Sequence, residues 1–218
     1  MHTVLIVLLI GTLVASAVSF VVMGVLQHLR ASALARKAHE MGMRFSPEDP
    51  FDLPCVLAEF TLVSSGHSPR ADNVIYGRLD GRAVRAFDFR YEVGHGIQRL
   101  TRHYSVITVE SPQEVDSMLM WHEDDLPAAP VSLQLANWRL GQWLYEGSRP
   151  VAVALGEVCA GLGRPVSMET RGKAAMLFAP VTGSRRAYAA QTPDVAKIVA
   201  GIVEALSRVD RPCGEDDD

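Results

Sequence analysis

The first part of the chain is apolar without interruption. Residues 4–26, a run of 23, include no Asp, Glu, Lys, Arg or His. A helix that rises about 1.5 Å per residue would extend this run over about 35 Å, which exceeds a hydrocarbon core of about 30 Å. The pattern predicts a transmembrane anchor over residues 1–27, followed by a basic juxtamembrane helix and linker over residues 28–50.

A cleaved signal peptide is the alternative for this segment. Ala15, Ser16 and Ala17 offer a small-residue cleavage site. The residues before the apolar run include neither Lys nor Arg, however, and the run continues well beyond that site. Because the apolar core of a signal peptide has about 7–15 residues, the pattern favours an anchor that is retained.

Positive charges follow the apolar run and none precedes it. Positively charged flanks stay on the cytoplasmic side, so we expect a bacterial inner (plasma) membrane protein whose C-terminal domain is cytoplasmic and touches membrane lipid. Three cysteines at no metal-like spacing agree with a reducing compartment. The flanking charges are Arg30, Arg36, Lys37 and Arg44, and the cysteines are Cys55, Cys159 and Cys213.

The next segment, residues 51–125, has the pattern of a β-rich lobe. We expect a strand at residues 56–63 and a loop at residues 64–72. Asp80 and Gly81 then separate two strand-like runs, which is the signal of a two-residue hairpin. In that hairpin Val74 would face Phe87, Tyr76 would face Arg85, and Asn73 would face Asp88. Residues 104–110 would add the next antiparallel strand.

The second strand of this hairpin alternates with a period of two. Aromatic and apolar positions would form a core stripe, and the charged positions between them would form a solvent face or a row of ion pairs. Gly94 and Gly96 would end the strand. The core stripe consists of Phe87, Phe89, Tyr91 and Val93, and the charged positions are Asp88, Arg90 and Glu92.

Residues 126–210 read as a mixed α+β lobe, and residues 211–218 as an acidic, solvated tail. We expect a helix at 151–162, strands at 166–169 and 174–178, and a last helix that Thr192 caps. Apolar residues of that helix recur at helical spacing, which is typical of an amphipathic helix on a core. They are Val195, Ile198, Val199, Ile202, Val203 and Leu206. The fold class is therefore α+β: an N-terminal transmembrane helix, a mainly antiparallel sheet with packed helices, and a C-terminal amphipathic helix.

Several chemical signatures are absent from the sequence. It has no phosphate-binding P-loop, no G-x-G-x-x-G dinucleotide fingerprint, no C-x-x-C pair and no G-x-S-x-G elbow. The net charge of −4 gives no indication of nucleic-acid binding. We therefore expect no cofactor and no metal, and any binding site has to come from side chains that the fold brings together.

The first lobe carries a basic set that could bind a phosphate, an anionic headgroup or an acidic protein partner. The alternative is an ordinary mixed-charge sheet surface, because Asp80, Asp88 and Glu92 are interleaved with it. Two of its histidines lie in glycine-flanked loops, where functional residues concentrate. The set is His67, Arg70, His95, Arg99, Arg102 and His103.

Residues 121–125, Trp-His-Glu-Asp-Asp, form a second polar cluster. Carboxylates beside an imidazole can bind a divalent cation. The segment lacks the spaced ligands and the glycine of a calcium loop, however. A solvated acidic loop explains the same residues.

The apolar run also has small residues at a spacing of four. Gly11, Ala15 and Ser19 would lie on one helix face, where small side chains let two helices approach closely. A homodimer through this face is therefore a hypothesis.

Residues 42–45, 73–77 and 87–91 together resemble a group of uncharacterised bacterial single-pass membrane proteins. The shared pattern is a Gly/aromatic entry segment, an Asn-Val-x-x-Gly hairpin and a Phe-Asp-aromatic-x-Tyr strand. The resemblance covers roughly residues 30–115. It implies the architecture and adds no catalytic residue, because the group has no established activity.

Two classes of function remain open. The first is a membrane-anchored module that presents a cytoplasmic α+β domain to a partner protein or to the membrane surface. The second is a membrane-tethered enzyme, such as a hydrolase, with His95 or His103 as base and Asp88 or Glu92 to orient it. A deep pocket that holds two or more of these groups would favour the enzyme.

Overall fold

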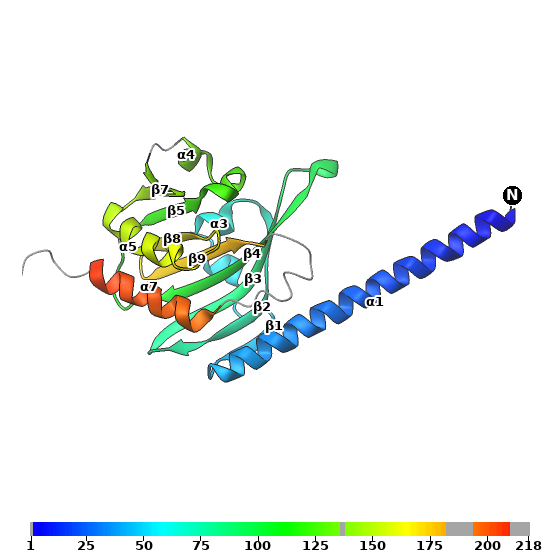
Figure 1. Ribbon diagram of the computed structural model, residues 1–218, viewed down its shortest axis with the longest axis horizontal. Coiled ribbons are helices and arrows are strands. Elements are labelled where there is room, and N and C mark those ends of the chain that lie inside the picture. Colours follow the sequence, from blue (N-terminus) through cyan, green and yellow to red (C-terminus); the bar gives the residue numbers. More distant parts are fainter. Residues whose placement is uncertain (1, 136–137, 182–193, 210–218) are drawn as a thin grey trace, which may run out of the picture.

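The computed structural model describes residues 2–135, 138–181 and 194–209. A single antiparallel sheet forms the body, helices pack on both of its faces, and a long amino-terminal helix extends away from it (Figure 1). The predicted α+β class with a large antiparallel sheet and packed helices is confirmed.

The sheet has nine described strands in the order β1-β2-β3-β4-β9-β8-β5-β7-β6. Strands from the two predicted lobes pair directly, because β4 pairs with β9 and β5 pairs with β7 and β8. The strands are β1 (Arg44–Glu48), β2 (His67–Leu79), β3 (Arg82–Val93), β4 (Leu100–Glu110), β5 (Met118–His122), β6 (Arg139–Leu140), β7 (Trp143–Gly147), β8 (Ser167–Arg171) and β9 (Ala174–Pro180).

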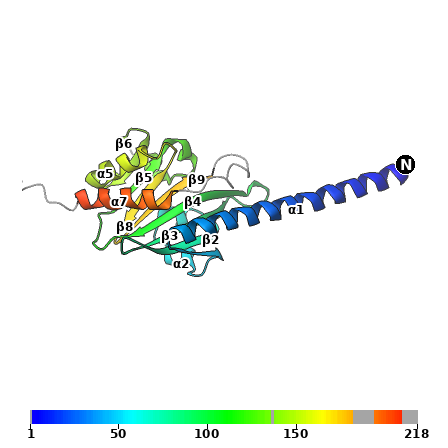
Figure 2. The same ribbon diagram turned by 60° about the horizontal axis from the view of Figure 1, so that its bottom comes forward.

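The helices divide between the two faces of the sheet (Figure 2). The carboxy-terminal part of α1 shares one face with α5 and α7, and α2, α3 and α4 cover the other. The α-helices are α1 (His2–Glu40), α2 (Leu53–Val56), α3 (Thr61–Ser64), α4 (Val131–Gln134), α5 (Arg149–Ala160) and α7 (Val195–Val209), and the 3₁₀ helices are η1 (Gly96–Gln98) and η2 (Glu123–Ala128).

Each face of the sheet has its own hydrophobic core. On β3, Val84 and Ala86 belong to the core under α5 and α7, while Phe87, Phe89 and Tyr91 belong to the core on the opposite face. This is the period of two that the sequence predicts, and the predicted core stripe is confirmed for these three aromatic residues. The charged positions between them lie on the side of the sheet that α1 approaches.

Helix α1 contacts the sheet through one short stripe near its carboxy terminus. Arg30, Leu34 and Ala38 are buried, and their spacing of four places them on one helix face. Every described side chain between Ile6 and Leu29 is exposed. Gly42, with φ of 68°, closes the helix in a Schellman motif, in which the amide of Met43 donates to the Ala38 carbonyl at 2.8 Å.

The expected transmembrane helix is not supported. Within the part of the chain that the structure describes, no helix is both long and apolar enough to cross a membrane.

The segment before β2 differs from the prediction. Residues 56–63 are not a strand: residue 56 ends the short helix α2, residues 57–60 form a turn, and residues 61–63 belong to the short helix α3. The Asp49 carboxylate accepts the amide of Leu53 at 2.6 Å and a proline stands in the first turn, so α2 begins here. The predicted loop at residues 64–72 is also wrong from His67 onward, since the length of β3 lets β2 extend to the pair His67–Glu92.

The hairpin forms at the predicted turn, with one irregularity. Asp80 and Gly81 both have positive φ, and Tyr76 lies opposite Arg85 as expected. Asp72 rather than Asn73 lies opposite Asp88, because the register shifts between Asp72 and Ile75. Asn73 has φ of 55° at this bulge and donates its side-chain amide to Asp88 at 2.9 Å.

The carboxy-terminal half follows the pattern more closely. The predicted helix at 151–162 is α5, and the two predicted strands around the Gly172 turn are β8 and β9. In α7 the apolar stripe is buried, with Val203 partly buried. The proposed cap Thr192 and the tail at 211–218 lie outside the described residues.

One buried carboxylate joins the sheet to α3. The side chain of Glu169 on β8 is 1% exposed. It accepts the backbone amide of Thr61 at 2.8 Å and the Thr61 hydroxyl at 3.0 Å, and Arg171 contacts it from the same strand. A buried charge needs such partners, and here they include the first amide of a helix.

We predict that Glu169→Ala lowers the free energy of unfolding by about 2–3 kcal/mol, because it leaves the Thr61 amide without its acceptor. Urea unfolding of the full chain measures this change, and the exposed Glu146→Ala on β7 is the matched control. Equal stabilities of the two variants would contradict the assigned role of Glu169.

Candidate functional site

The β3–β4 connection forms a tight tip at one end of the sheet. Strands β3 and β4 stay paired up to Val93 and Leu100. Gly94 has φ of 78°, and a Cβ atom there would lie 2.6 Å from the Gln98 carbonyl oxygen, so this position needs glycine. Helix η1 then exposes Ile97 completely, and Leu100 is 55% exposed.

Four polar side chains gather behind this tip, and we call them the tip cluster: His67, Glu92, His95 and Arg99. The rings of His67 and His95 stack with centroids 5.2 Å apart. Glu92 lies near both Arg99 and His67, with its Oε2 atom 3.3 Å from Arg99 Nη1 and 3.9 Å from His67 Nε2. The structure thus brings together three of the six residues that the sequence singles out for binding.

The other three residues of that basic set lie apart. Arg70 pairs with Asp72 at 3.3 Å. Arg102 lies near Asp125, which also accepts the Tyr104 hydroxyl. His103 lies opposite Arg90 in the register of β3 and β4, and its carbonyl accepts the amide of Val181 at 2.9 Å. The set predicted from the sequence is therefore not one continuous surface.

Asp88 is already engaged and does not stand beside a histidine base. Arg30 of α1 donates to both of its carboxylate oxygens, at 3.0 Å from Nε and 2.6 Å from Nη2, and Asn73 donates as well. The Arg30 and Asp88 side chains are 6% and 15% exposed. Of the two expectations for this face of β3, Asp88 fits an ion pair and not a solvent face. This pairing removes Asp88 from the hydrolase hypothesis.

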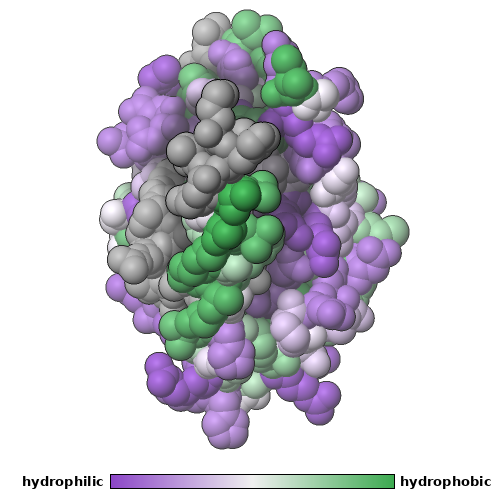
Figure 3. Space-filling view, turned by 90° about the vertical axis from the view of Figure 1, so that its right-hand side faces the viewer, coloured by the Kyte–Doolittle hydropathy of each residue, from purple (hydrophilic) through white to green (hydrophobic). Residues whose placement is uncertain are grey.

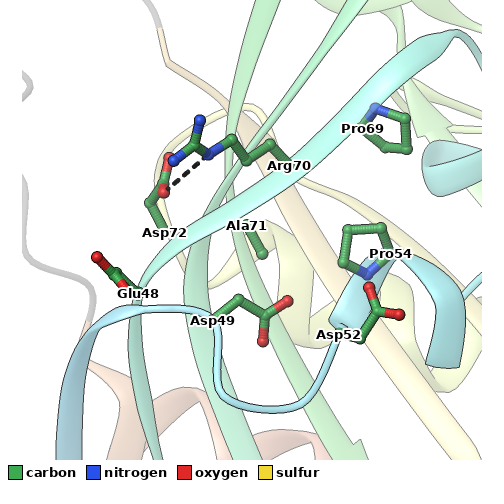
Figure 4. A pocket seen from close by; sticks show the side chains of 8 residues that line it. All are labelled: Glu48, Asp49, Asp52, Pro54, Pro69, Arg70, Ala71 and Asp72. Atoms are coloured by element: carbon green, nitrogen blue, oxygen red, sulfur yellow. Dashed lines mark ion pairs between the residues drawn. The ribbon is translucent and has the colours of Figure 1, made fainter.

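A hollow of about 340 Å³ opens beside the entry to β2 (Figure 4). Its lining is mainly acidic, and Arg70 is its one cationic lining residue. Asp49 is committed to structure, because its carboxylate accepts the amides of Phe51 and Leu53. Asp72 is paired with Arg70 and Arg90. The lining residues are Glu48, Asp49, Asp52, Pro54, Pro69, Arg70, Ala71 and Asp72.

The predicted solvated loop at residues 121–125 is in large part buried. Tyr104 donates its hydroxyl to the Asp125 carboxylate at 2.9 Å, and the Trp121 indole donates to the Asp125 carbonyl at 3.1 Å. Arg102 Nη1 lies 3.8 Å from Asp125 Oδ1. Burial raises the pKa of the Asp125 carboxyl, although the Tyr104 hydrogen bond and the Arg102 charge act in the opposite direction.

Neighbouring groups fit a structural role for this network. Burial also raises the pKa of the Tyr104 and Tyr91 hydroxyls, which keeps both phenols neutral, and Tyr104 donates to Asp125. His122 is buried, and its Nδ1 atom accepts the amide of Asp124 at 3.2 Å. Within the described residues, no group of three or more His, Cys, Asp or Glu side chains could hold a metal ion.

Two features of the site were missed by sequence reasoning. The exposure of Ile97 and Leu100 depends on how η1 turns, and the available signal was an apolar residue within a glycine-flanked loop. The pair between Arg30 and Asp88 joins residues 58 positions apart. No local pattern predicts a contact at that distance along the chain.

We predict a pH-dependent difference between the protein and its Asp125→Asn variant. The raised pKa means that folding favours protonated Asp125, and this stabilisation is lost as the pH rises from about 4 through the folded-state pKa. The unfolding free energy of the parent relative to the variant should therefore fall over this window in a pH series of urea unfolding curves. The exposed Asp124→Asn should not show this trend, and a rise with pH for Asp125→Asn would contradict the shift.

Comparison with known proteins shows a similarity of fold. No family model matches this chain, and no curated protein matches it either. The crystal structure of the mycobacterial trehalose monomycolate transport factor A, TtfA, is similar with a TM-score of 0.51 and 18% sequence identity. The match covers 87% of this chain and 98% of that chain. This chain therefore shares its fold with a transport factor.

Proposed function

We propose that the protein is a membrane-attached interaction module that serves a transport system. The amino-terminal part of α1 attaches it to the bacterial inner membrane, and the sheet domain presents a surface to a protein partner on the cytoplasmic side. The polar clusters of the described residues are held together by structural pairings, which favours an interaction module over a catalyst.

The observation that carries this proposal is the arrangement of α1. Its carboxy-terminal third is fixed to the sheet by Arg30, Leu34 and Ala38, while its apolar part extends away from the body (Figure 1). Exposed apolar surface of this extent marks an interaction or membrane site. No described helix meets the requirement for a membrane span by itself, so the support comes from the charge-free sequence of residues 4–26 and from this exposure.

The flanking charges support the cytoplasmic orientation. Arg30 is buried in an ion pair with Asp88, so it does not act as a free flanking charge. Arg36, Lys37 and Arg44 remain on the carboxy-terminal side, and Arg36 is well exposed to the surroundings. These three still favour retention of the domain on the cytoplasmic side.

The fold likeness supports a role in transport. The similar solved structure is named as a transport factor for trehalose monomycolate. We extend from it the general idea of an accessory domain for a membrane transport system. The substrate of that system is left open, since the likeness is one of fold.

The helix face of Gly11, Ala15 and Ser19 stays a prediction for a homodimer. These residues lie in the exposed part of α1, where a Cβ atom at Gly11 would meet no other atom within 4 Å. The α1 helix of a second copy could therefore approach this face closely without a steric clash.

We predict that the full chain stays in the membrane pellet after a sodium carbonate wash, and that Leu9→Lys/Leu13→Lys moves it to the supernatant. Each lysine within a bilayer costs about 3 kcal/mol. Val131→Lys/Leu135→Lys is the matched control, because these two residues are equally exposed and also four apart, but lie on the domain body. Release of the parent by carbonate, or equal behaviour of both double variants, would overturn the membrane attachment.

A further inference from the structure

The tip of the β3–β4 hairpin is an apolar protrusion on a polar surface. Ile97 is completely exposed and Leu100 is more than half exposed. Isoleucine and leucine are among the residues most often buried in proteins, and here two of them are exposed close together at one tip. The polar tip cluster, which includes His67, His95 and Arg99, gathers behind them.

The protein holds this tip in a fixed shape. The β3–β4 ladder is continuous from Val84–Val109 to Val93–Leu100. Beyond it, the amide of Gln98 donates to the His95 carbonyl at 3.2 Å, and Gly94 allows the chain to pass close to Gln98. The side chain of Ile97 is therefore presented outward by an ordered turn at the end of two long strands.

The direction of the tip matches that of α1. The hairpin tip and the amino-terminal end of α1 extend from the same side of the body in both ribbon views (Figures 1 and 2). Seen from that side, hydrophobic surface on α1 stands among hydrophilic residues (Figure 3). A membrane that held the apolar part of α1 would therefore lie on the side toward which the hairpin tip extends.

We propose that the hairpin tip is a second membrane contact, in which Ile97 and Leu100 enter the boundary between headgroups and acyl chains while Arg99 stays at the level of anionic headgroups. This inference rests on the proposed membrane attachment through α1. Arginine suits that position, because its long stem can lie along apolar surface while its guanidinium reaches phosphate. The arrangement would give the domain two points of contact and so fix its orientation on the membrane.

A bilayer is a better occupant for this tip than a protein surface. A specific protein interface buries about 800 Å² on each partner, and two side chains on a narrow turn offer much less. A convex tip would also need a matching pocket on a protein. A lipid boundary accepts a protruding apolar side chain without one.

The test uses the full chain reconstituted in vesicles of phosphatidylcholine and phosphatidylglycerol. A spin label is placed at Ile97→Cys, at Val14→Cys in α1, or at Lys173→Cys in the turn at the opposite end of β4. Cys55 and Cys213 are replaced by Ser. Cys159 can stay, because it is buried and burial raises the pKa of its thiol to about 12, which keeps it unreactive. Power saturation with oxygen and a nickel complex then gives the depth of each label.

We expect the labels at positions 14 and 97 to be more accessible to oxygen than to the nickel complex, and the label at position 173 to show the reverse. A label at position 97 that behaves like the one at 173, while position 14 is in the bilayer, would overturn the tip contact and leave the membrane attachment intact. Water accessibility at position 14 would overturn the membrane attachment itself. Because the vesicles hold no other protein, a tip that needs a protein partner would give the first of these two failures.

Discussion

The structure depends on one ion pair between the amino-terminal helix and the sheet. Arg30 and Asp88 form a two-pronged contact that is nearly closed to solvent, and Asn73 adds a third donor. Removing two charges from water is costly, and this cost is offset only when the geometry is good and the remaining polar groups are satisfied. Arg30 and Asp88 therefore each need the other to remain buried, and their pair fixes the position of α1 against β3.

This pair connects several features that are separate in the sequence. The bulge at Asn73 turns its side chain toward Asp88, so an irregularity of β2 supplies part of the α1 contact. Leu34 and Ala38 continue the same stripe into the hydrophobic core shared with α5 and α7. The exposed part of α1 and the β3–β4 tip consequently keep a fixed relation to each other, which two membrane contacts on one side would require.

Sequence patterns predicted the local part of this fold and missed the long-range part. The Asp80–Gly81 hairpin, the aromatic stripe of β3 and the stripe of α7 follow from periodicity and turn chemistry, which act over a few residues. The pairs Arg30–Asp88 and Thr61–Glu169 join residues 58 and 108 positions apart. For the same reason periodicity left Asp88 either on a solvent face or in a row of ion pairs, and it assigned residues 56–63 to a strand. Sequence reasoning singled out the tip-cluster residues without showing that they meet.

We infer that α1 and the sheet domain form one rigid unit through Arg30 and Asp88. Double electron–electron resonance between spin labels at Val14→Cys and Lys173→Cys, in the full chain in lipid vesicles, measures this directly. A rigid unit predicts a single narrow distance distribution that becomes broad in the Arg30→Ala variant. A broad distribution in the parent protein, or a narrow one that Arg30→Ala leaves unchanged, would contradict the claim.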